Sequence, residues 1–381
     1  MQNQLPDFLK RGVEQLIDEV NFLTKLSGQR KLRIKLGIDP TSTDLHLGHM
    51  AVLKKLADFQ FAGHQAVLII GDFTAMIGDP TGRAGSREPL TKEQIKEHMK
   101  SYLKQAGKII NLSQAEVRYN SEWFNKFNFH DVLKLMGQFT LQQLTEREDI
   151  KKRIIEGKPV GYYEPLYSAM QAYDSVVLEA DLELGGRDQL LNMLAGKDLM
   201  HKMSQTPQDV LTVPLILGTD GVQKMSKSKG NYIALMDEPS EMFGKIMSVP
   251  DAQLSNYYEL LTDMTFNLEE HPKEAKLRLA TYLVRVLHSE AKAKKAEANF
   301  VKTFSKKENP EDIQNLHLDK ATNILDVLVL GGVASKGEAR RLITQGGIKL
   351  DQDTVSSVTL EIQPHSHQVL KIGKHRFWKI G

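Results

Sequence analysis

Cysteine is absent from this 381-residue sequence, so disulfides, thiolate metal sites and cysteine nucleophiles are excluded. Long apolar runs are absent too, because no segment approaches the roughly 20 apolar residues that a membrane-spanning helix needs. The N-terminal segment Met1–Lys10 carries Pro6 and Asp7 and has no apolar signal core. We therefore expect a cytoplasmic protein with no membrane association.

A charge surplus of one sign is also missing. The 50 basic and 48 acidic residues leave a formal net charge of +2. This balance does not indicate a nucleic-acid partner, but it leaves room for a local basic patch. The length is too great for one ordinary domain and predicts two or three.

The first third of the sequence alternates between helical and strand patterns. Apolar spacing predicts a helix over 12–26, and residues 33–38 read as a strand. A helix is expected over 47–62 with Gly63 as its C-terminal cap, followed by a buried strand over 67–72. Strand, long helix and strand in this order predict a βαβ unit.

The same alternation continues to residue 235. A loop rich in Gly, Pro and Arg spans 78–89, and helical patterns follow over 92–108 and 128–150. Short strand-like runs recur at Val176–Leu178, Leu182–Leu184 and Val213–Leu217. We interpret residues 30–235 as one doubly wound, Rossmann-like α/β domain built on a parallel sheet.

Composition changes after Pro239 and predict two further domains. Residues 240–308 are helical in composition, and Asn309–Asp312 reads as a linker. The last 61 residues combine two helical patterns with short strand-like segments. The expected domains are therefore a catalytic one over 1–239 with an N-terminal helix, a helical one over 240–315 and a small α+β one over 321–381.

The tetrapeptide His46-Leu47-Gly48-His49 follows the first strand and its turn. Two histidines at i and i+3 share one face at the start of a helix, whose free N–H groups and dipole favour phosphate. Imidazoles can donate hydrogen bonds to a phosphoryl group, and Gly48 leaves room for a ligand. A metal half-site or a pair of solvated histidines remains open for this motif alone.

A second basic motif, Lys224-Met225-Ser226-Lys227-Ser228, follows a glycine-flanked turn. Most such runs are solvated basic loops. Hydroxyl residues between the lysines can order this one, and the preceding turn makes it mobile yet anchored.

The two motifs together, HLGH and then KMSKS about 175 residues later, resemble the class I aminoacyl-tRNA synthetases. Three further stretches resemble the bacterial branch of the tyrosyl-tRNA synthetase family. These are Gly71–Pro80, the Tyr167-x-x-x-Gln171-x-x-Asp174 pattern and Gly185–Gln189. The resemblance runs from about Gly37 to Ile380.

This resemblance implies a tyrosine site. Its implied members are Gly37, Asp79, Tyr167, Gln171, Asp174 and Gln189. Tyr167, Gln171 and Asp174 are three to four residues apart, so they share one helical face. Asp174 would accept a hydrogen bond from the phenol, and Asp79 would face the substrate ammonium. Taken alone, the helical pattern also fits a polar face that points at solvent.

One position departs from the family pattern. Some members carry a second tyrosine two residues before the glycine that corresponds to Gly37, where it touches the substrate hydroxyl. This sequence has Lys35 there. That second hydroxyl contact is therefore not assigned.

The implied reaction joins tyrosine to ATP, releases pyrophosphate, and transfers tyrosine to the 3′ end of tRNA(Tyr). His46 and His49 would steady the α-phosphate, while Lys224 and Lys227 would bind the phosphates that leave. The implied ATP-binding residues are Asp39, Thr41, Gly48, Arg83, Arg87, Asp188, Met225, Ser226 and Lys227. Mg²⁺ would accompany ATP, and no metal cage is visible in the sequence.

The C-terminal segment 321–381 resembles an S4-type RNA-binding domain. It holds eight basic and five acidic side chains, a surplus that suits phosphate contact. Lys336, Arg340 and Arg341 are the candidate RNA-binding residues. The family resemblance also implies a homodimer. The apolar helical region near 128–146 fits an interface, and it fits the core equally well.

Three other functions compete with this interpretation. A tryptophanyl-tRNA synthetase shares the fold and both motifs, but the YxxxQxxD pattern and the S4-like tail argue against it. A non-enzymatic RNA-binding relative would not need intact HLGH and KMSKS. A small-molecule adenylyltransferase would leave the tail unexplained.

Overall fold

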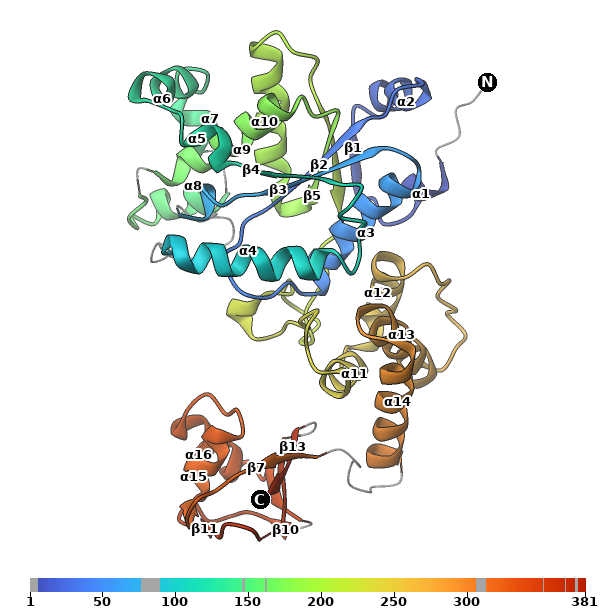
Figure 1. Cartoon of the computed structure of the whole chain (residues 1–381), viewed down its shortest axis with the longest axis vertical. Coiled ribbons are helices and arrows are strands. Elements are labelled where there is room, and N and C mark those ends of the chain that lie inside the picture. Colours follow the sequence, from blue (N-terminus) through green and yellow to red (C-terminus); the bar gives the residue numbers. More distant parts are fainter. Residues whose placement is uncertain are drawn as a thin grey trace. The chain divides into compact units, whose positions relative to one another are not determined.

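A computed structural model describes residues 6–76, 90–145, 148–161, 163–305, 313–351, 353–366, 368–373 and 376–381. The chain forms two compact units (Figure 1). One runs to Met236 and includes Val249–Leu279, and the other combines Asp237–Ser248 with Ala280–Gly381. The predicted loop over 78–89 and the linker 309–312 lie outside the described residues. The division into three domains at 239 and 315 stays a prediction.

A six-stranded sheet forms the centre of the first unit. Its strands are β1 (Gln15–Ile17), β2 (Arg33–Ile38), β3 (Gln65–Ile70), β4 (Glu116–Tyr119), β5 (Leu182–Gly186) and β6 (Asp209–Val213). They lie in the order β1-β6-β5-β2-β3-β4, and all are parallel except β1, which pairs antiparallel with β6 at one edge. The α/β class with a doubly wound parallel sheet is therefore confirmed.

Four long helices cover this sheet. They are α3 (Leu47–Phe61), α4 (Lys92–Ala106), α9 (Glu164–Leu178) and α10 (Leu190–Lys202). Helices α3 and α4 connect strands on one side of β2, whereas α9 and α10 lead to strands on the other side, so the right-handed crossovers place the two pairs on opposite faces (Figure 1). The order reverses between β2 and β5. A crevice is expected at the carboxyl ends of these two strands.

The N-terminal prediction was half wrong. The structure has the short helix α1 (Asp7–Lys10), then strand β1, then helix α2 (Glu19–Ser27), where one helix over 12–26 was expected. Gly12 and Asp18 have positive φ angles of 64° and 59°, which a continuous helix cannot contain. The expected helix over 47–62 is confirmed as α3, and Gly63 follows its cap with φ 93°.

Three other boundaries also differ from the prediction. Val176–Leu178 is the last turn of α9, because a three-residue apolar run fits a buried helix face as well as a strand. Strand β6 ends at Val213, where a strand over Val213–Leu217 was expected. The helical pattern over 128–150 divides into α6 (Phe129–Met136), α7 (Leu141–Thr145) and α8 (Glu148–Ile155).

Helical composition after Pro239 is confirmed. The helices there are α11 (Pro239–Met247), α12 (Leu254–Leu261), α13 (Pro272–Leu287) and α14 (Glu290–Ser305). Short helices elsewhere are α5 (Ser121–Phe124) and the 3₁₀ turns η1 (Thr74–Met76), η2 (Arg187–Gln189), η3 (Lys227–Lys229) and η4 (Asp251–Gln253). Within the described parts of the chain, no helix combines the length and apolar character that crossing a bilayer requires.

The C-terminal region is a small α+β fold with its own core. Its helices are α15 (Ile324–Leu330) and α16 (Lys336–Thr344), and its strands are β7 (Gln314–Leu316), β8 (Thr322–Asn323), β9 (Ile348–Leu350), β10 (Asp353–Thr354), β11 (Glu361–Ile362), β12 (Val369–Ile372) and β13 (Arg376–Ile380). Five of these strands form one sheet in the order β10-β9-β12-β13-β7. The apolar cluster that they bury draws all its fully buried members from residues 316–380.

Candidate active site

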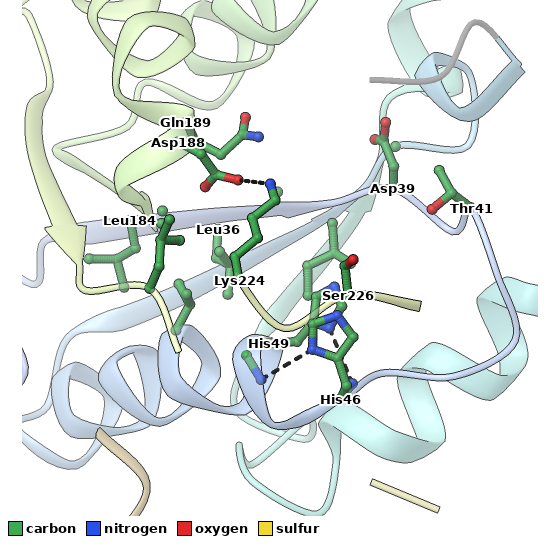
Figure 2. A pocket seen from close by; sticks show the side chains of 18 of the residues that line it. Leu36, Asp39, Thr41, His46, His49, Leu184, Asp188, Gln189, Lys224 and Ser226 are labelled. Atoms are coloured by element: carbon green, nitrogen blue, oxygen red, sulfur yellow. Dashed lines mark hydrogen bonds and ion pairs between the residues drawn. The ribbon is translucent and has the colours of Figure 1, made fainter. Parts of the chain in front are cut away.

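A cavity of about 800 Å³ opens where the strand order reverses. It is lined by the carboxyl ends of β2 and β5, the start of α3 and the KMSKS segment (Figure 2), and also by one face of α9. The structure brings these sequence-predicted residues to it: Gly37, Asp39, Thr41, His46, Gly48, His49, Tyr167, Gln171, Asp174, Asp188, Gln189, Lys224, Met225, Ser226 and Lys227. Asp79, Arg83 and Arg87 lie outside the described residues.

The histidine pair sits at the first turn of α3. His46 is the N-cap, and its Nδ1 accepts from the Gly48 N–H at 3.2 Å. His49 Nδ1 accepts from the His46 N–H, also at 3.2 Å, and the two ring centroids are 4.0 Å apart. A Cβ at position 48 would lie 3.0 Å from the His46 ring, so a larger residue would require this ring to shift.

This arrangement corrects one expectation about the helix N-terminus. The Leu47 N–H donates to Ile233 O at 3.0 Å, the Gly48 N–H to His46 Nδ1, and the His49 N–H to His46 O at 2.8 Å. The first-turn N–H groups are thus already bonded and are not free for phosphate. The imidazoles themselves are the donors that the first turn of α3 can offer.

Both imidazoles are held in the neutral form. Burial lowers the pKa of His46 to about 2, and His49 and the KMSKS lysines act in the same direction. Burial and the nearby Lys227 ammonium lower the pKa of His49 to about 4. Because each Nδ1 accepts a backbone N–H, each neutral ring carries its proton on Nε2. Two Nε2–H donors therefore remain for a ligand.

The KMSKS segment is anchored by its backbone. The Met225 N–H donates to Ile216 O at 2.8 Å, and the Ser226 N–H donates to the side-chain oxygen of the buried Asn231 at 2.9 Å. Lys224 Nζ lies 2.8 Å from Asp188, and Lys227 Nζ lies 3.0 Å from Asp44. Carboxylates thus hold both lysine ammonium groups at the cavity, within reach of α3.

The polar face of α9 points into the protein, so the solvent-facing alternative is wrong. Tyr167 Oη donates to Asp39 at 2.9 Å, and Gln171 donates to Glu183 at 3.2 Å. Asp174 is only 4% exposed and accepts from Trp123 Nε1 at 3.0 Å. Its second oxygen lies 3.4 Å from Asn120 Nδ2.

A hydrogen-bonded chain joins this face to the end of β2. Asn120 Nδ2 also donates to Thr74 Oγ1 at 3.0 Å, and Thr74 donates to Asp39 at 2.9 Å. A Cβ at Gly71 would lie 2.0 Å from the Asp39 carboxylate, so glycine makes room for it. Asp39 and Asp174 are therefore fixed in orientation by separate neutral donors that the Asn120–Thr74 hydrogen bond links.

Asp174 combines burial with neutral partners. Burial raises its pKa to about 7, against the opposing influence of Lys35, Trp123 and Asn120. Near neutral pH this carboxyl therefore exchanges between an acceptor-only anion and a protonated form. A raised carboxyl pKa in a cavity is typical of a functional site.

The sequence interpretation assigned no role to Lys35 and missed other residues of the site. Lys35 and Glu183 form a buried ion pair at 2.8 Å, and both line the cavity. The available signal was a charged residue in the interior of each of two central strands, Lys35 in RIKLGI and Glu183 in LELGG. Tyr102 also lines the cavity, 3.0 Å from Ser42, and no spacing in the sequence indicated it.

The candidate RNA-binding residues lie on a separate part of the chain. Lys336, Arg340 and Arg341 are exposed on α16. Lys336 lies 2.6 Å from Asp326, and Arg341 lies 3.9 Å from Glu338. Arg340 is therefore the most direct candidate for phosphate contact on this helix.

Known proteins match both the sequence and the fold. The family model described as class I tRNA synthetases (W and Y) matches residues 27–305. The tyrosine–tRNA ligase of Thermotoga maritima is 46% identical over 384 aligned positions, which cover 98% of this chain and 96% of that protein. The tyrosine–tRNA ligase of Aquifex aeolicus is 44% identical, and the alignment covers 98% of this chain and 97% of that protein.

Solved structures with low sequence identity share the fold. A C-terminally truncated mitochondrial tyrosyl-tRNA synthetase from Aspergillus nidulans has a TM-score of 0.66 at 22% identity, covering 78% of this chain and 93% of that chain. A tyrosyl-tRNA synthetase from Archaeoglobus fulgidus, complexed with L-tyrosine, has a TM-score of 0.60 at 24% identity. The match covers 76% of this chain and 98% of that chain.

Proposed function

The chain belongs to the tyrosine–tRNA ligase family of class I tRNA synthetases, and from that premise we propose how its residues share the reaction. The enzyme activates tyrosine with ATP to tyrosyl-adenylate, releases pyrophosphate, and transfers tyrosine to tRNA(Tyr). The observation that supports our assignment is the single cavity, which gathers the histidine pair, both KMSKS lysines and Asp174.

Tyrosine binds along α9 and the end of β2. Asp174 accepts the hydrogen bond of the phenol, and Gln171 and Tyr167 line the space between phenol and carboxylate. Gly37 and Gln189 lie at the walls of this space. Asp79, with help from Asp39, takes the ammonium group. A phenylalanine ring would leave the buried Asp174 carboxylate without that partner, which disfavours it.

ATP binds across the first turn of α3. His46 and His49 donate their Nε2–H groups to the α-phosphate, and Gly48 and Thr41 line the nucleotide space. Asp188 holds the ribose once Lys224 has moved to the phosphates. Attack by the tyrosine carboxylate then needs positioning and charge stabilisation and no covalent enzyme intermediate.

Departing pyrophosphate is stabilised by cations. Lys224 and Lys227 exchange their carboxylate partners, Asp188 and Asp44, for the β- and γ-phosphates, and Met225 and Ser226 carry them there. Arg83 and Arg87 add further charge. Mg²⁺ arrives with ATP, and among the described residues no group of three or more His, Asp or Glu side chains could hold a resident metal.

The remaining assignments concern partners. Lys336, Arg340 and Arg341 contact the tRNA backbone. The enzyme forms a homodimer through the region around α6 to α8, where these apolar side chains are exposed: Phe129, Leu133, Leu141, Ile154 and Ile155. A sedimentation mass near twice 43.0 kDa would support this. The enzyme acts in the cytoplasm, where tRNA is charged.

ATP–pyrophosphate exchange with each of the twenty amino acids tests the assignment of the tyrosine site. Native enzyme should exchange with tyrosine alone. In Asp174→Asn the preference for tyrosine over phenylalanine in kcat/KM should fall about tenfold to a hundredfold, since a hydrogen bond to a charged group contributes about 1.5–3 kcal/mol. The exposed Asp198→Asn on α10 is the control and should match native enzyme. An unchanged preference in Asp174→Asn would reject Asp174 as the phenol acceptor.

A further inference from the structure

Lys35 is a buried lysine on a central strand of the sheet. Its side chain is 1% exposed, and it lines the cavity together with Gln171 and Asp174. A charged group in such a place is costly unless it is paired and hydrogen-bonded. Strand β2 would bury an apolar side chain here at lower cost, so the lysine calls for an explanation.

The hydrogen bonds of Lys35 occupy its whole ammonium group. Nζ lies 2.8 Å from Glu183 on β5, and it donates to Ser175 Oγ at 2.7 Å and to Gln171 O at 3.1 Å. An ammonium group has three N–H donors, so none remains for a substrate. Lys35 therefore does not replace a hydroxyl that would contact the phenol directly.

Two of the three bonds of Lys35 go to the turn of α9 that carries Asp174, and its third partner, Glu183, is bonded to the same turn. Gln171 and Ser175 flank Asp174 on that turn, and Glu183 itself accepts from Gln171 Nε2 at 3.2 Å and Ser175 Oγ at 3.2 Å. The Lys35–Glu183 pair thus connects α9 to strands β2 and β5. This restraint fixes the direction in which Gln171 and Asp174 face the cavity.

Lys35 also acts on Asp174 through its charge. The charged groups facing Asp174 are Lys35 from β2, which favours the anion, and Asp39 at the end of β2, which disfavours it, while Glu183 on β5 pairs Lys35. Trp123 and Asn120 supply neutral donors only. Without Lys35, burial would drive Asp174 further toward its protonated form.

We propose that Lys35, clamped by Glu183, is a positioning residue for tyrosine selection. It holds Gln171 and Asp174 of α9 in the orientation that faces the phenol, and its charge favours the anionic form of Asp174, which accepts the hydrogen bond. This inference rests on the proposed role of Asp174. It extends that role to a buried ion pair that never touches the substrate.

The test is the pH profile of tyrosine activation in Lys35→Met/Glu183→Gln. The paired substitution leaves no unpaired buried charge, so the protein is expected to fold, whereas Lys35→Met alone would strand Glu183. At pH 7 we expect tyrosine kcat/KM to fall about fivefold to tenfold, chiefly through KM, and to recover above pH 8 as Asp174 ionises. Phenylalanine kcat/KM should not change.

A matched control separates this role from the loss of any buried ion pair. Lys25 and Asp209 form such a pair at 2.9 Å, with side chains 10% and 0% exposed, away from the cavity lining. Lys25→Met/Asp209→Asn should keep the native pH profile for tyrosine and the native preference over phenylalanine.

Three outcomes would overturn the proposals, and they distinguish the role of Lys35 from that of Asp174. A profile of Lys35→Met/Glu183→Gln that superimposes on the native one, while Asp174→Asn loses its tyrosine preference, rejects the role of Lys35 alone. If Asp174→Asn keeps that preference, the proposed tyrosine site itself is wrong. An equal loss for tyrosine and phenylalanine at every pH would make the ion pair merely structural and would also reject the inference.

Discussion

At the scale of single residues, burial sets the proton state of the site. It raises the pKa of Asp174 to about 7 and lowers those of His46 and His49 to about 2 and about 4. In each case the neutral form gains, because the low-polarity surroundings penalise charge. A modest change in nearby charge can therefore change which of these side chains donate a hydrogen bond and which accept one.

A stability measurement on Asp174→Asn tests the raised carboxyl pKa. The folded-state pKa of about 7 lies above the ordinary aspartate pKa of 3.8, so folding takes up a proton between these pH values. The protonated Asp174 side chain therefore contributes most to the free energy of unfolding at low pH, and this contribution is lost as the pH rises through about 7. Between pH 4 and pH 8, the free energy of unfolding of Asp174→Asn should therefore rise by on the order of 4 kcal/mol relative to that of native enzyme.

Urea unfolding at several pH values measures this difference, with Asp198→Asn as the exposed control. Curves of unfolding free energy against pH that run parallel for native enzyme and Asp174→Asn would contradict the raised pKa. The histidines act in the opposite sense, since their lowered pKa values remove stability as pH falls below 6.5. Their effect is common to all these variants and cancels in the comparison.

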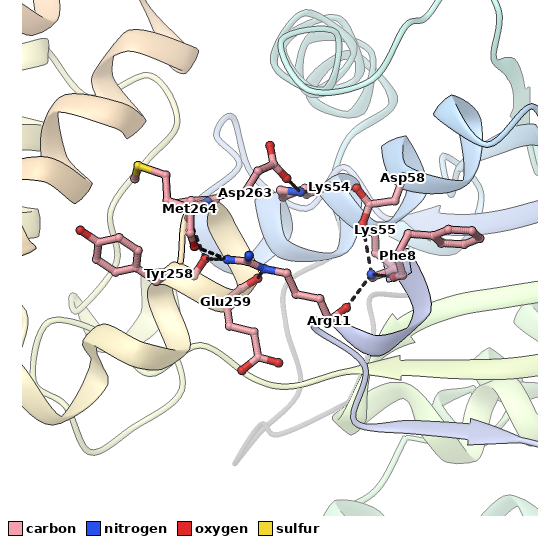
Figure 3. Close-up of polar contacts among 10 residues, drawn as sticks. Phe8, Arg11, Lys54, Lys55, Asp58, Tyr258, Glu259, Asp263 and Met264 are labelled. Carbon is pink, nitrogen blue, oxygen red and sulfur yellow. Dashed lines mark hydrogen bonds and ion pairs between the residues drawn. The ribbon is translucent and has the colours of Figure 1, made fainter. Parts of the chain in front are cut away.

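At the scale of elements, the N-terminal segment braces the helix that begins with the histidine pair. Lys55 on α3 donates to the backbone oxygens of Phe8 and Arg11 at 2.5 and 2.7 Å (Figure 3). Arg11 in turn donates to Tyr258 O at 2.7 Å, Glu259 O at 3.0 Å and Met264 O at 2.8 Å. Segment 6–12 thus joins α3 to the end of α12.

Replacing Arg11 with alanine should weaken this brace. Three carbonyl groups near the C-terminal end of α12 would lose a charged donor, which we expect to lower the free energy of unfolding by about 2–4 kcal/mol. Arg11→Lys, which keeps the charge but not the planar fork, should recover only part of the loss. Chemical denaturation measures both. An unchanged free energy of unfolding in Arg11→Ala would show that these hydrogen bonds do not contribute to stability.

At the scale of the whole molecule, the C-terminal region has a core of its own. Its fully buried apolar members all come from residues 316–380, and its sheet contains strands β7, β9, β10, β12 and β13 only. A region with a separate core can be removed without opening the rest of the fold. Removing this region therefore tests whether tRNA charging depends on it while tyrosine activation does not.

A chain that ends at residue 305 should therefore keep the first step and lose the second. Tyrosine-dependent ATP–pyrophosphate exchange should stay within about twofold of native, because every described cavity residue precedes Gly230. Charging of tRNA(Tyr) should fall at least tenfold, as phosphate contacts with α16 are lost. Filter assays of charged tRNA measure this. Equal charging by both chains would place tRNA recognition elsewhere.

The sequence by itself determined the family, the parallel sheet and most of the site. Helix α3 and strands β2 and β3 follow from apolar periodicity, which depends only on neighbours in the chain. The histidine and lysine motifs were identified by residue type and spacing, and the α9 face by its resemblance to the family pattern. One cavity is lined by His46, Gly48, His49, Lys224–Ser228, Tyr167, Gln171 and Asp174. Local patterns were sufficient wherever the relevant neighbours are close in sequence.

Tertiary structure alone decided what depends on distant partners. Residues 15–17 became a strand because β6 offers an edge, some two hundred residues further along the chain. The Lys35–Glu183 pair and the raised pKa of Asp174 exist only once β2, β5 and α9 bury them together. Burial and charge pairing are properties of three-dimensional surroundings, so no spacing along one chain could fix them.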